Sequence, residues 1–255
     1  MEKRNVLVKI FMILAVSFGI LYANELKDIT TNDLAKKRNT LEGTLELITT
    51  LQAKLKAEPN SYDASWQYAA ICYFYGDYYL KDTDKEKKKK YFTLCKDAAE
   101  NAVKLNPKGV DGHYWLGIGL GMWSDANGIL DSLFFADDVA NEMTKVIEMN
   151  PGYFRGTPWM VRASVYAFAP GWPLSIGDTE KAYADVKMAF KYGGDYRVMY
   201  VLYCRILMHN SRWKDAMTVI NKGLALPYDK NIPVEEDAAI AKLKDYKIQV
   251  QKELK

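Results

Sequence analysis

Apolar positions along the chain recur at the spacing of a helix, and one arrangement of them occurs four times. An aromatic residue is followed four places later by a small residue, and seven places later by another mostly apolar side chain. In chain order, these are Trp66, Trp115, Trp159 and Tyr200; Ala70, Gly119, Ala163 and Cys204; and Tyr73, Met122, Tyr166 and Leu207. Residues at these spacings share one face of a helix, so each segment predicts a helix with a single apolar stripe.

A second helix is predicted after each of these segments, with small or apolar residues at three positions. They are Cys95, Val139, Ala182 and Ala216; Ala99, Met143, Val186 and Ile220; and Ala102, Val146, Ala189 and Gly223. The units end at Pro107, Pro151, Gly194 and Pro227, residues that stop a helix. Small side chains allow two helices to cross closely, so the pattern predicts four packed helix pairs.

This arrangement resembles the tetratricopeptide repeat, a helix pair that recurs along the chain and stacks into a solenoid. The resemblance extends over residues 60–228. It implies an all-α, right-handed solenoid of four degenerate tetratricopeptide-type helix pairs. The alternative is an irregular helical domain in which the tryptophans fill the core. The predicted units are residues 60–107, 110–151, 155–194 and 195–228.

The flanking segments are predicted to cap the two open faces of the stack. Residues 33–57 carry leucine and isoleucine at spacing seven, behind a helix start signal at Thr31 and Asn32. Residues 234–253 place apolar side chains on one helical face among many lysines. The alternative for the first stripe is self-association through a coiled-coil-like seam. With these capping helices, residues 24–255 are predicted to form a single helical repeat domain.

Residues 1–23 have the pattern of a secretory signal peptide. Three basic residues, Lys3, Arg4 and Lys9, precede an apolar run of 12 residues, and Ala23 stands at the predicted cleavage site. A membrane-spanning helix needs roughly 20 residues, which disfavours the alternative of an uncleaved anchor. The sequence therefore predicts an exported, periplasmic protein that is soluble after cleavage.

The charge balance argues against a nucleic-acid partner. Removal of the predicted signal peptide leaves 32 basic and 31 acidic residues. Binding to nucleic acid depends largely on neutralising phosphates with lysine and arginine, and this chain has almost no excess of them. The run from Lys87 to Lys90 is the exception, and we predict that it lies on a solvated loop or helix face.

The three cysteines are an odd number for an exported protein, which raises the alternative of a reactive thiol. Cys95 and Cys204 occupy small positions of the repeat, where a thiol behaves as a buried apolar group. Cys72 and Cys95 fall at similar heights on paired helices, so a disulfide between them is the other alternative. No cysteine precedes Cys72, and the chain therefore has no thiol for N-terminal lipid attachment.

The sequence predicts no enzyme. The two histidines, His113 and His209, are not at a spacing typical of metal ligands. The chain has no G-x-S-x-G, phosphate-binding loop or dinucleotide fingerprint. Adjacent acids such as Asp137 and Asp138 point to different sides of a helix. We expect no catalytic residue, no metal and no cofactor, although a carboxylate pair from distant segments stays open.

The turns inside the helix pairs differ in length. The distance from the last stripe position of the first helix to the first of the second is 22, 17, 16 and 9 residues, so three turns carry insertions of 13, 8 and 7. Insertions gathered at one edge of a solenoid often mark its working surface. The first insertion is charged, while the other two are apolar. With the aromatic residues beside them, the apolar insertions provide the candidate ligand or partner contacts: Trp123, Ile129, Leu130, Phe134, Phe135, Phe168, Trp172 and Leu174.

Two interpretations of the apolar insertions stay open. They pack down as a lid over the core, or they wall a hydrophobic cleft. Arg155, Arg162 and Arg197, near the starts of the third and fourth units, are candidates for an anion-binding group. Most arginines at such places are ordinary surface residues.

A narrower resemblance comes from the third insertion, where Pro173 to Asp178 reads Pro-Leu-Ser-Ile-Gly-Asp ahead of Glu180-Lys181-Ala182. With the lengthened turns, it is similar to the T component of tetratricopeptide-associated TRAP transporters. The resemblance implies a periplasmic accessory protein that docks the substrate-binding protein of a TRAP-type importer. It also implies a small apolar ligand and assembly into a homo-oligomer such as a trimer. Many members are lipoproteins, and the missing cysteine argues against membrane tethering. The alternative function is a general periplasmic scaffold that binds peptide segments of an envelope complex.

Overall fold

The computed structural model describes residues 31–255, which form twelve α-helices and two short turns of other helix types. The first half contains α2 (Thr31–Lys37), α3 (Leu41–Ala57), α4 (Tyr62–Phe74), the π-helical turn η2 (Tyr75–Tyr79), α5 (Lys85–Leu105), α6 (Val110–Asn127), α7 (Ile129–Phe134) and α8 (Ala136–Met149). The second half contains the 3-10 turn η3 (Tyr153–Gly156), α9 (Thr157–Phe168), α10 (Thr179–Gly193), α11 (Arg197–His209), α12 (Trp213–Ala225) and α13 (Pro233–Glu253). The predicted signal peptide lies outside the described residues.

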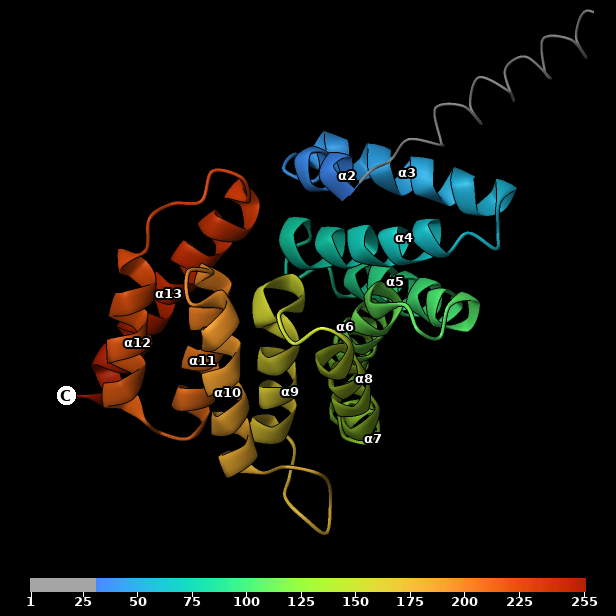
Figure 1. Ribbon diagram of the computed structural model, residues 1–255. Helices are drawn as coiled ribbons and strands as arrows, with labels where there is room; N and C mark the ends of the chain where they lie inside the picture. Colours follow the sequence, from blue (N-terminus) through green and yellow to red (C-terminus); the bar gives the residue numbers. More distant parts are fainter. Residues whose placement is uncertain (1–30) are drawn as a thin grey trace, which may run out of the picture.

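Four helix pairs stack in chain order: α4 with α5, α6 with α8, α9 with α10, and α11 with α12. Figure 1 shows neighbouring helices running in opposite directions, joined by turns. The prediction of an all-α solenoid of helix pairs is confirmed. None of the helices in residues 31–255 is long and apolar enough to cross a membrane.

The small positions of the repeat are buried where helices cross, both within a pair and between one pair and the next. Cys95, at the first small position of α5, is fully buried, and so are its equivalents Ala182 and Ala216. At Gly119 of α6, an added Cβ would lie 2.8 Å from the backbone Cα of Lys96. A side chain of any size there would push α6 away from α5, so the repeat pattern reflects backbone-to-backbone packing.

The N-terminal cap differs from the single helix that the spacing predicted over 33–57. It is broken into α2 and α3, because Thr40 adopts an extended backbone and its hydroxyl accepts a hydrogen bond from the Gly43 amide at 3.1 Å. A threonine in this role starts a new helix. An apolar stripe does not reveal such a break, because α2 and α3 both keep apolar residues at the expected positions. Leu34 of α2 and Leu51 of α3 are buried.

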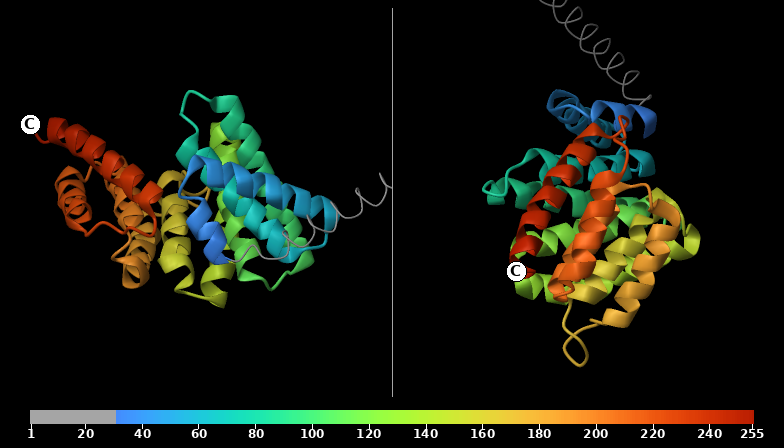
Figure 2. Two further views of the ribbon diagram at one scale, coloured as in Figure 1. Left: turned by 90° about the horizontal axis from the view of Figure 1, so that it is seen from above. Right: turned by 90° about the vertical axis from the view of Figure 1, so that its left-hand side faces the viewer.

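The segment after α2 meets the start of the last helix. Arg38, just after α2, forms an ion pair with Glu235 in the first turn of α13, 197 residues further along. The side-chain amide of Asn39 donates to the backbone carbonyl of Asn231 at 3.2 Å. In two views at right angles, α2 lies beside the start of α13 (Figures 1 and 2). The solenoid therefore has a contact between its first and last described helices.

All three cysteines are buried and free. Burial raises the pKa of Cys72 to about 12, against a weaker lowering effect from the Tyr68 hydroxyl. Burial also raises the pKa of Cys204 to about 12, and that of Cys95 well above its usual range. The thiols at the small positions are packing residues, and the alternative of a disulfide between Cys72 and Cys95 is not seen.

We predict that Gly119→Ala destabilises the chain by about 1–3 kcal/mol, since the new methyl group meets the α5 backbone. Gly121→Ala, two residues further along α6, is the matched control, because the nearest atom to its Cβ is 3.9 Å away. The control gains up to about 1 kcal/mol from helix propensity. Urea denaturation of both variants measures the two effects, and equal stabilities would contradict the close crossing.

We predict that the native chain does not react with an aromatic disulfide reagent at about pH 8, because only the thiolate is nucleophilic. In urea, all three thiols become accessible and titrate. Absorbance of the released chromophore counts them in each state. Rapid reaction of one thiol in the native chain would show an exposed cysteine.

Candidate functional site

The second insertion forms α7, which places apolar side chains in solvent. Leu130 is 83% exposed and Phe134 75%. Phe135 instead packs edge-on against Trp123, with ring centroids 5.5 Å apart. Ile129 is the first residue of α7. Part of this insertion therefore packs down as the lid interpretation expects, and part points outward.

The third insertion is a loop between α9 and α10 that extends from the lower end of the molecule in Figure 1. Its base is fixed, since the Gly177 amide donates to the Pro170 carbonyl at 2.8 Å and the Asp178 carboxylate caps α10. Trp172 and Leu174 are 90% and 75% exposed. Phe168, at the end of α9, packs against the His209 ring. The two exposed side chains of this loop point into solvent and do not line the cavity described below.

The first insertion has a packed first part and an exposed, charged second part. Its first residues form η2, which continues α4 and packs against α13. The Tyr73 hydroxyl donates to Asp77 at 3.1 Å, and burial raises the pKa of Asp77. The run from Lys87 to Lys90 lies in the first turns of α5, on a mostly exposed face. Residues 81–90, which carry the charges of this insertion, are mostly exposed and agree with the prediction of a solvated face.

The three candidate arginines are engaged inside the protein. Arg197 is almost fully buried and pairs with Glu236 of α13 at 2.9 Å, while its other nitrogens donate to backbone carbonyls at the end of α12. Arg162 forms a two-point pair with Asp185 at 2.7 and 2.8 Å. Those hydrogen bonds raise the pKa of Arg162. Both arginines are structural, which corrects the expectation of an anion-binding group.

Arg155 is more accessible but is also paired. Its guanidinium lies 2.9 Å from Asp195 and 3.4 Å from Asp229, and it stacks over the Tyr196 ring. Two carboxylates around one cation leave an excess of negative charge. This arginine therefore holds the segments after α10 and α12 together, and is not available to bind an anion by itself.

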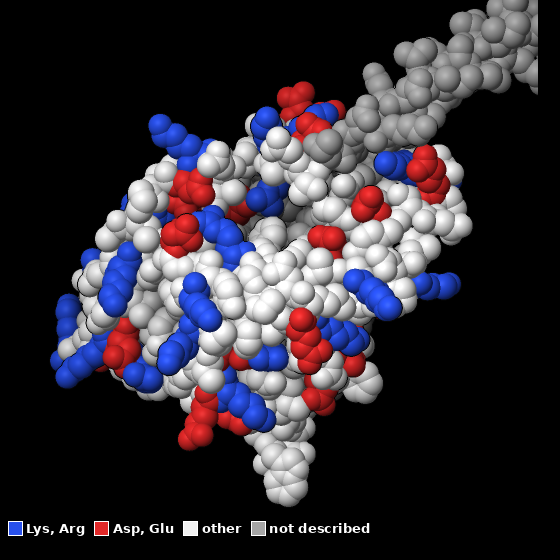
Figure 3. All heavy atoms as spheres, viewed as in Figure 1, with Lys and Arg blue, Asp and Glu red and all other residues white. Residues whose placement is uncertain are grey.

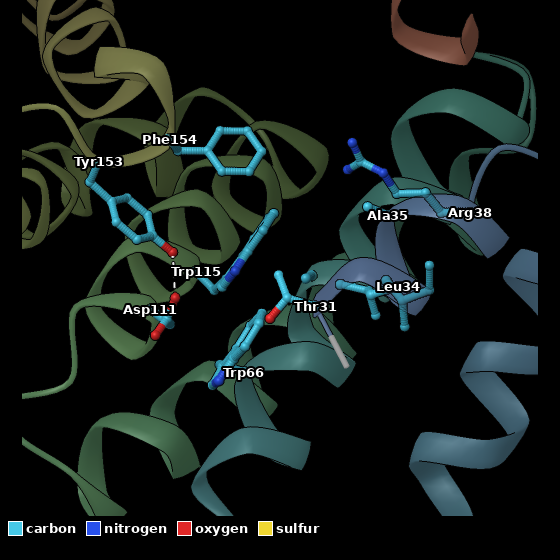
Figure 4. Close-up of a pocket in the computed structure, with 11 residues that line it drawn as sticks. Thr31, Leu34, Ala35, Arg38, Trp66, Asp111, Trp115, Tyr153 and Phe154 are labelled. Atoms are coloured by element: carbon cyan, nitrogen blue, oxygen red, sulfur yellow. Dashed lines mark hydrogen bonds between the residues drawn. The ribbon is translucent and has the colours of Figure 1, made fainter. Parts of the chain in front are cut away.

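A cavity of about 120 Å³ lies at the hollow between the two halves of the molecule. Figure 3 shows this face hollowed near the N-terminal helices, with charged groups of both signs around the hollow. Figure 4 shows side chains from α2, α4, α6 and η3 around one space. The lining residues are Thr31, Leu34, Ala35, Arg38, Trp66, Ala70, Ile71, Asp111, Trp115, Tyr153 and Phe154. None of them comes from the inserted turns between paired helices.

The charges at this cavity belong to two groups. Arg38 pairs with Glu235, and burial raises the pKa of Glu235 although the Arg38 charge opposes this. Asp111 accepts a hydrogen bond from the Tyr153 hydroxyl at 2.6 Å. Burial raises the pKa of Tyr153 far above its usual value, and the Asp111 charge adds to this. The phenol therefore stays protonated and donates, while Asp111 remains the acceptor.

The backbone of η3 sets the position of one cavity wall. Phe154, Arg155 and Gly156 have φ values of 44°, 57° and 73°, a left-handed conformation that costs a non-glycine residue about 1–3 kcal/mol. The turn stacks the Phe154 ring on Tyr114, with centroids 5.4 Å apart and planes at 28°. The surrounding structure therefore holds a strained turn that presents an aromatic ring to the cavity.

The repeat pattern in the sequence identifies two aromatic residues of the cavity wall, although it does not show that they form a site. Trp66 and Trp115 are the aromatic positions of successive repeats. Because they lie on the first helices of neighbouring pairs, the repeat pattern alone indicates that their side chains are close together. No sequence pattern indicates that Ala35 and Arg38 line the cavity, because their position depends on how α2 folds back against α4. The η3 turn had none either, since Phe154 carries no glycine-like signature.

The histidine of α6 has a structural role, and it is not part of a metal-ligand group among the described residues. Within residues 31–255, no three His, Cys, Asp or Glu side chains are grouped to hold a metal ion. His113 lies between Glu142, at 2.5 Å from its Nδ1, and the Pro107 carbonyl, at 2.9 Å from its Nε2. This histidine links α6 to α8 as a buried structural residue.

The stacked pairs define a protein of the tetratricopeptide-repeat type, and a solved structure agrees. A thermophilic TPR protein of Thermus thermophilus superposes with a TM-score of 0.54 at 17% identity, over 76% of this chain and 89% of that one. Yeast Tom70 superposes with a TM-score of 0.42 at 14% identity, over 83% of this chain and 44% of Tom70. At such identities the Thermus structure supports the fold alone. No curated protein matches the chain.

The chain belongs to the family described as Regulator of microtubule dynamics protein 1-3, whose profile matches residues 29–157. The matched region includes α2 to α8 and η3. Every residue that lines the cavity falls within it. The candidate residues of the third insertion and Arg197 fall outside it.

We predict that Arg197→Ala destabilises the chain by about 3–5 kcal/mol, because it leaves Glu236 charged and unpaired in the interior. Arg212→Ala is the matched control, since Arg212 pairs with Asp215 at the surface, where both side chains are about half exposed. Surface pairs contribute about 0–1 kcal/mol. Urea denaturation compares the variants, and a small effect at Arg197 would contradict its structural role.

Proposed function

We propose that this protein is a non-enzymatic scaffold that binds a segment of a partner polypeptide in the cavity between its two halves. The single observation that carries the proposal is the cavity itself, walled by aromatic residues of α4, α6 and η3. Concave sites with apolar walls and few polar groups are typical binding sites. Solenoids of helix pairs commonly offer such concave surfaces to partners.

The family supports a regulatory and non-enzymatic role. Its description names regulation of microtubule dynamics. We carry over to this chain only that general character, because the description names no partner and no contact residue. The paired state of the candidate arginines and of His113 is consistent with a protein that binds without catalysis.

The importer accessory is the finer proposal, and it has less support. It depends on the resemblance of Pro173 to Asp178, a segment at the exposed edge of the fold, and the family match lies elsewhere in the chain. Exposed Trp172 and Leu174 offer a surface for a docked protein, so contact with a TRAP substrate-binding protein, a small apolar ligand and a trimer stay predictions. Export to the periplasm is likewise a prediction. The scaffold is the better supported function.

We predict that Ala35→Trp abolishes partner binding, since the larger side chain of α2 fills the cavity. Peptides are first selected against the wild-type chain from a displayed random library. Their affinities are then measured by isothermal titration calorimetry. We expect affinity to fall at least about tenfold, as when a binding pocket loses its apolar contact.

The control is the double variant Phe134→Ala with Trp172→Ala, which removes exposed apolar surface at the edge and leaves the cavity intact. We expect it to bind the selected peptides as the wild type does. Circular dichroism checks that both variants are folded. Loss of binding in the edge variant alone would place the partner site on the inserted turns and reject the cavity.

A further inference from the structure

The walls of the cavity are faces and edges of aromatic rings. Trp66 and Trp115 come from neighbouring helices, while Tyr153 and Phe154 come from the η3 turn (Figure 4). Phe154 lies edge-to-face with Trp115 at a centroid distance of 6.2 Å, and it is still 39% exposed. Aromatic rings attract a cation placed over their faces within about 6 Å.

The anionic groups beside these rings are carboxylates that have no cationic partner within residues 31–255. Asp111 lines the cavity and accepts its hydrogen bond from a neutral phenol. Among the described residues, no lysine, arginine or histidine lies within ion-pair distance of Asp111. Asp63 is exposed nearby and accepts the indole hydrogen bond of Trp66 at 3.1 Å. The negative charge of Asp111 is thus free to pair with a ligand.

The positive charge at the cavity is already compensated. Arg38 is paired with Glu235 and stacks over the Phe74 ring. Its Nε is buried without a hydrogen-bond partner among the described residues. A buried donor of this kind is costly unless a ligand or water satisfies it. Because this Nε atom is shielded from solvent, it is not available to a docked segment.

We propose that this cavity binds the side chain of a lysine or arginine of the partner segment. The aliphatic stem packs along the rings of Trp66, Trp115 and Phe154, and the cationic head reaches Asp111. This inference rests on the proposed function and names the class of partner: a polypeptide with an exposed basic residue.

Other occupants fit the charges less well. An acidic side chain meets the carboxylates of Asp111 and Asp63. A purely apolar group, such as a lipid chain, covers Asp111 without pairing with it, and burying an unpaired charge is unfavourable. A basic side chain satisfies both features, because its stem is apolar and its head is charged.

The test uses the full chain and four capped pentapeptides that differ only at the central residue: lysine, arginine, norleucine or glutamate. Norleucine retains an aliphatic stem and lacks the charge. Quenching of tryptophan fluorescence, checked by calorimetry, gives each affinity at low salt. We expect lysine and arginine to bind at least about fivefold more tightly than norleucine, and glutamate to bind most weakly. Raising the salt concentration should reduce the preference.

Asp111→Asn is the informative variant, because the amide oxygen still accepts from the Tyr153 hydroxyl while the charge is lost. We expect lysine affinity to fall to the norleucine level, with norleucine affinity unchanged. Asp125→Asn is the matched control, an exposed carboxylate near the other end of α6, and should retain the wild-type preference. Thermal unfolding checks that both variants fold as the wild type does.

The outcomes separate this inference from the proposed function. Equal binding of lysine and norleucine, or an unchanged preference in Asp111→Asn, would overturn the inference. If Ala35→Trp still blocked binding in that case, the proposed scaffold function would be retained, with an apolar partner segment in the cavity. Binding that is insensitive to Ala35→Trp would reject both. Failure of all four peptides to bind at millimolar concentration would also overturn the inference.

Discussion

The close crossing of one helix pair with the next is the constraint on which the rest of the structure depends. Gly119 and Cys95 face each other where α6 meets α5, and their equivalents recur through the stack. Because a glycine of α6 meets the backbone of α5, the contact fixes how closely the second helix pair packs on the first. The aromatic residue one turn before the small residue, such as Trp115 before Gly119, therefore has a defined position relative to the neighbouring helix. The cavity between Trp66 and Trp115 follows from that regular placement.

The sequence predicted what local periodicity determines and missed what tertiary contacts determine. The helix pairs and the buried small positions follow from spacing alone, since each depends on residues close in the chain. The burial and pairing of Arg197 do not follow from spacing, because Glu236 lies beside Arg197 only when α13 packs on α11. The exposed Trp172 and Phe134 were noticed as unusual loop residues, yet their composition could not show whether they turn inward.

The candidate site illustrates the same division. Its two tryptophans are visible in the repeat pattern, whereas its third wall is a left-handed turn without glycine at Phe154. No residue preference predicts a left-handed conformation at Phe154. The packing of Tyr114 and Trp115 around the Phe154 ring stabilises this conformation. The site thus combines residues of the repeat, Trp66 and Trp115, with the η3 turn, which occurs once in the chain. The unique part gives this solenoid a specific surface.

The contact between Arg38 and Glu235 also changes how the chain reaches its fold. Stacked repeats usually interact only with their neighbours, so they can form progressively and fray from their ends. A contact between residues 197 positions apart requires that both halves be in place before it forms. Long-range contacts of this kind slow folding, since the loop entropy must be overcome first. The pair therefore couples the segment after the first described helix to the start of the last one, and neither can detach without the loss of that contact.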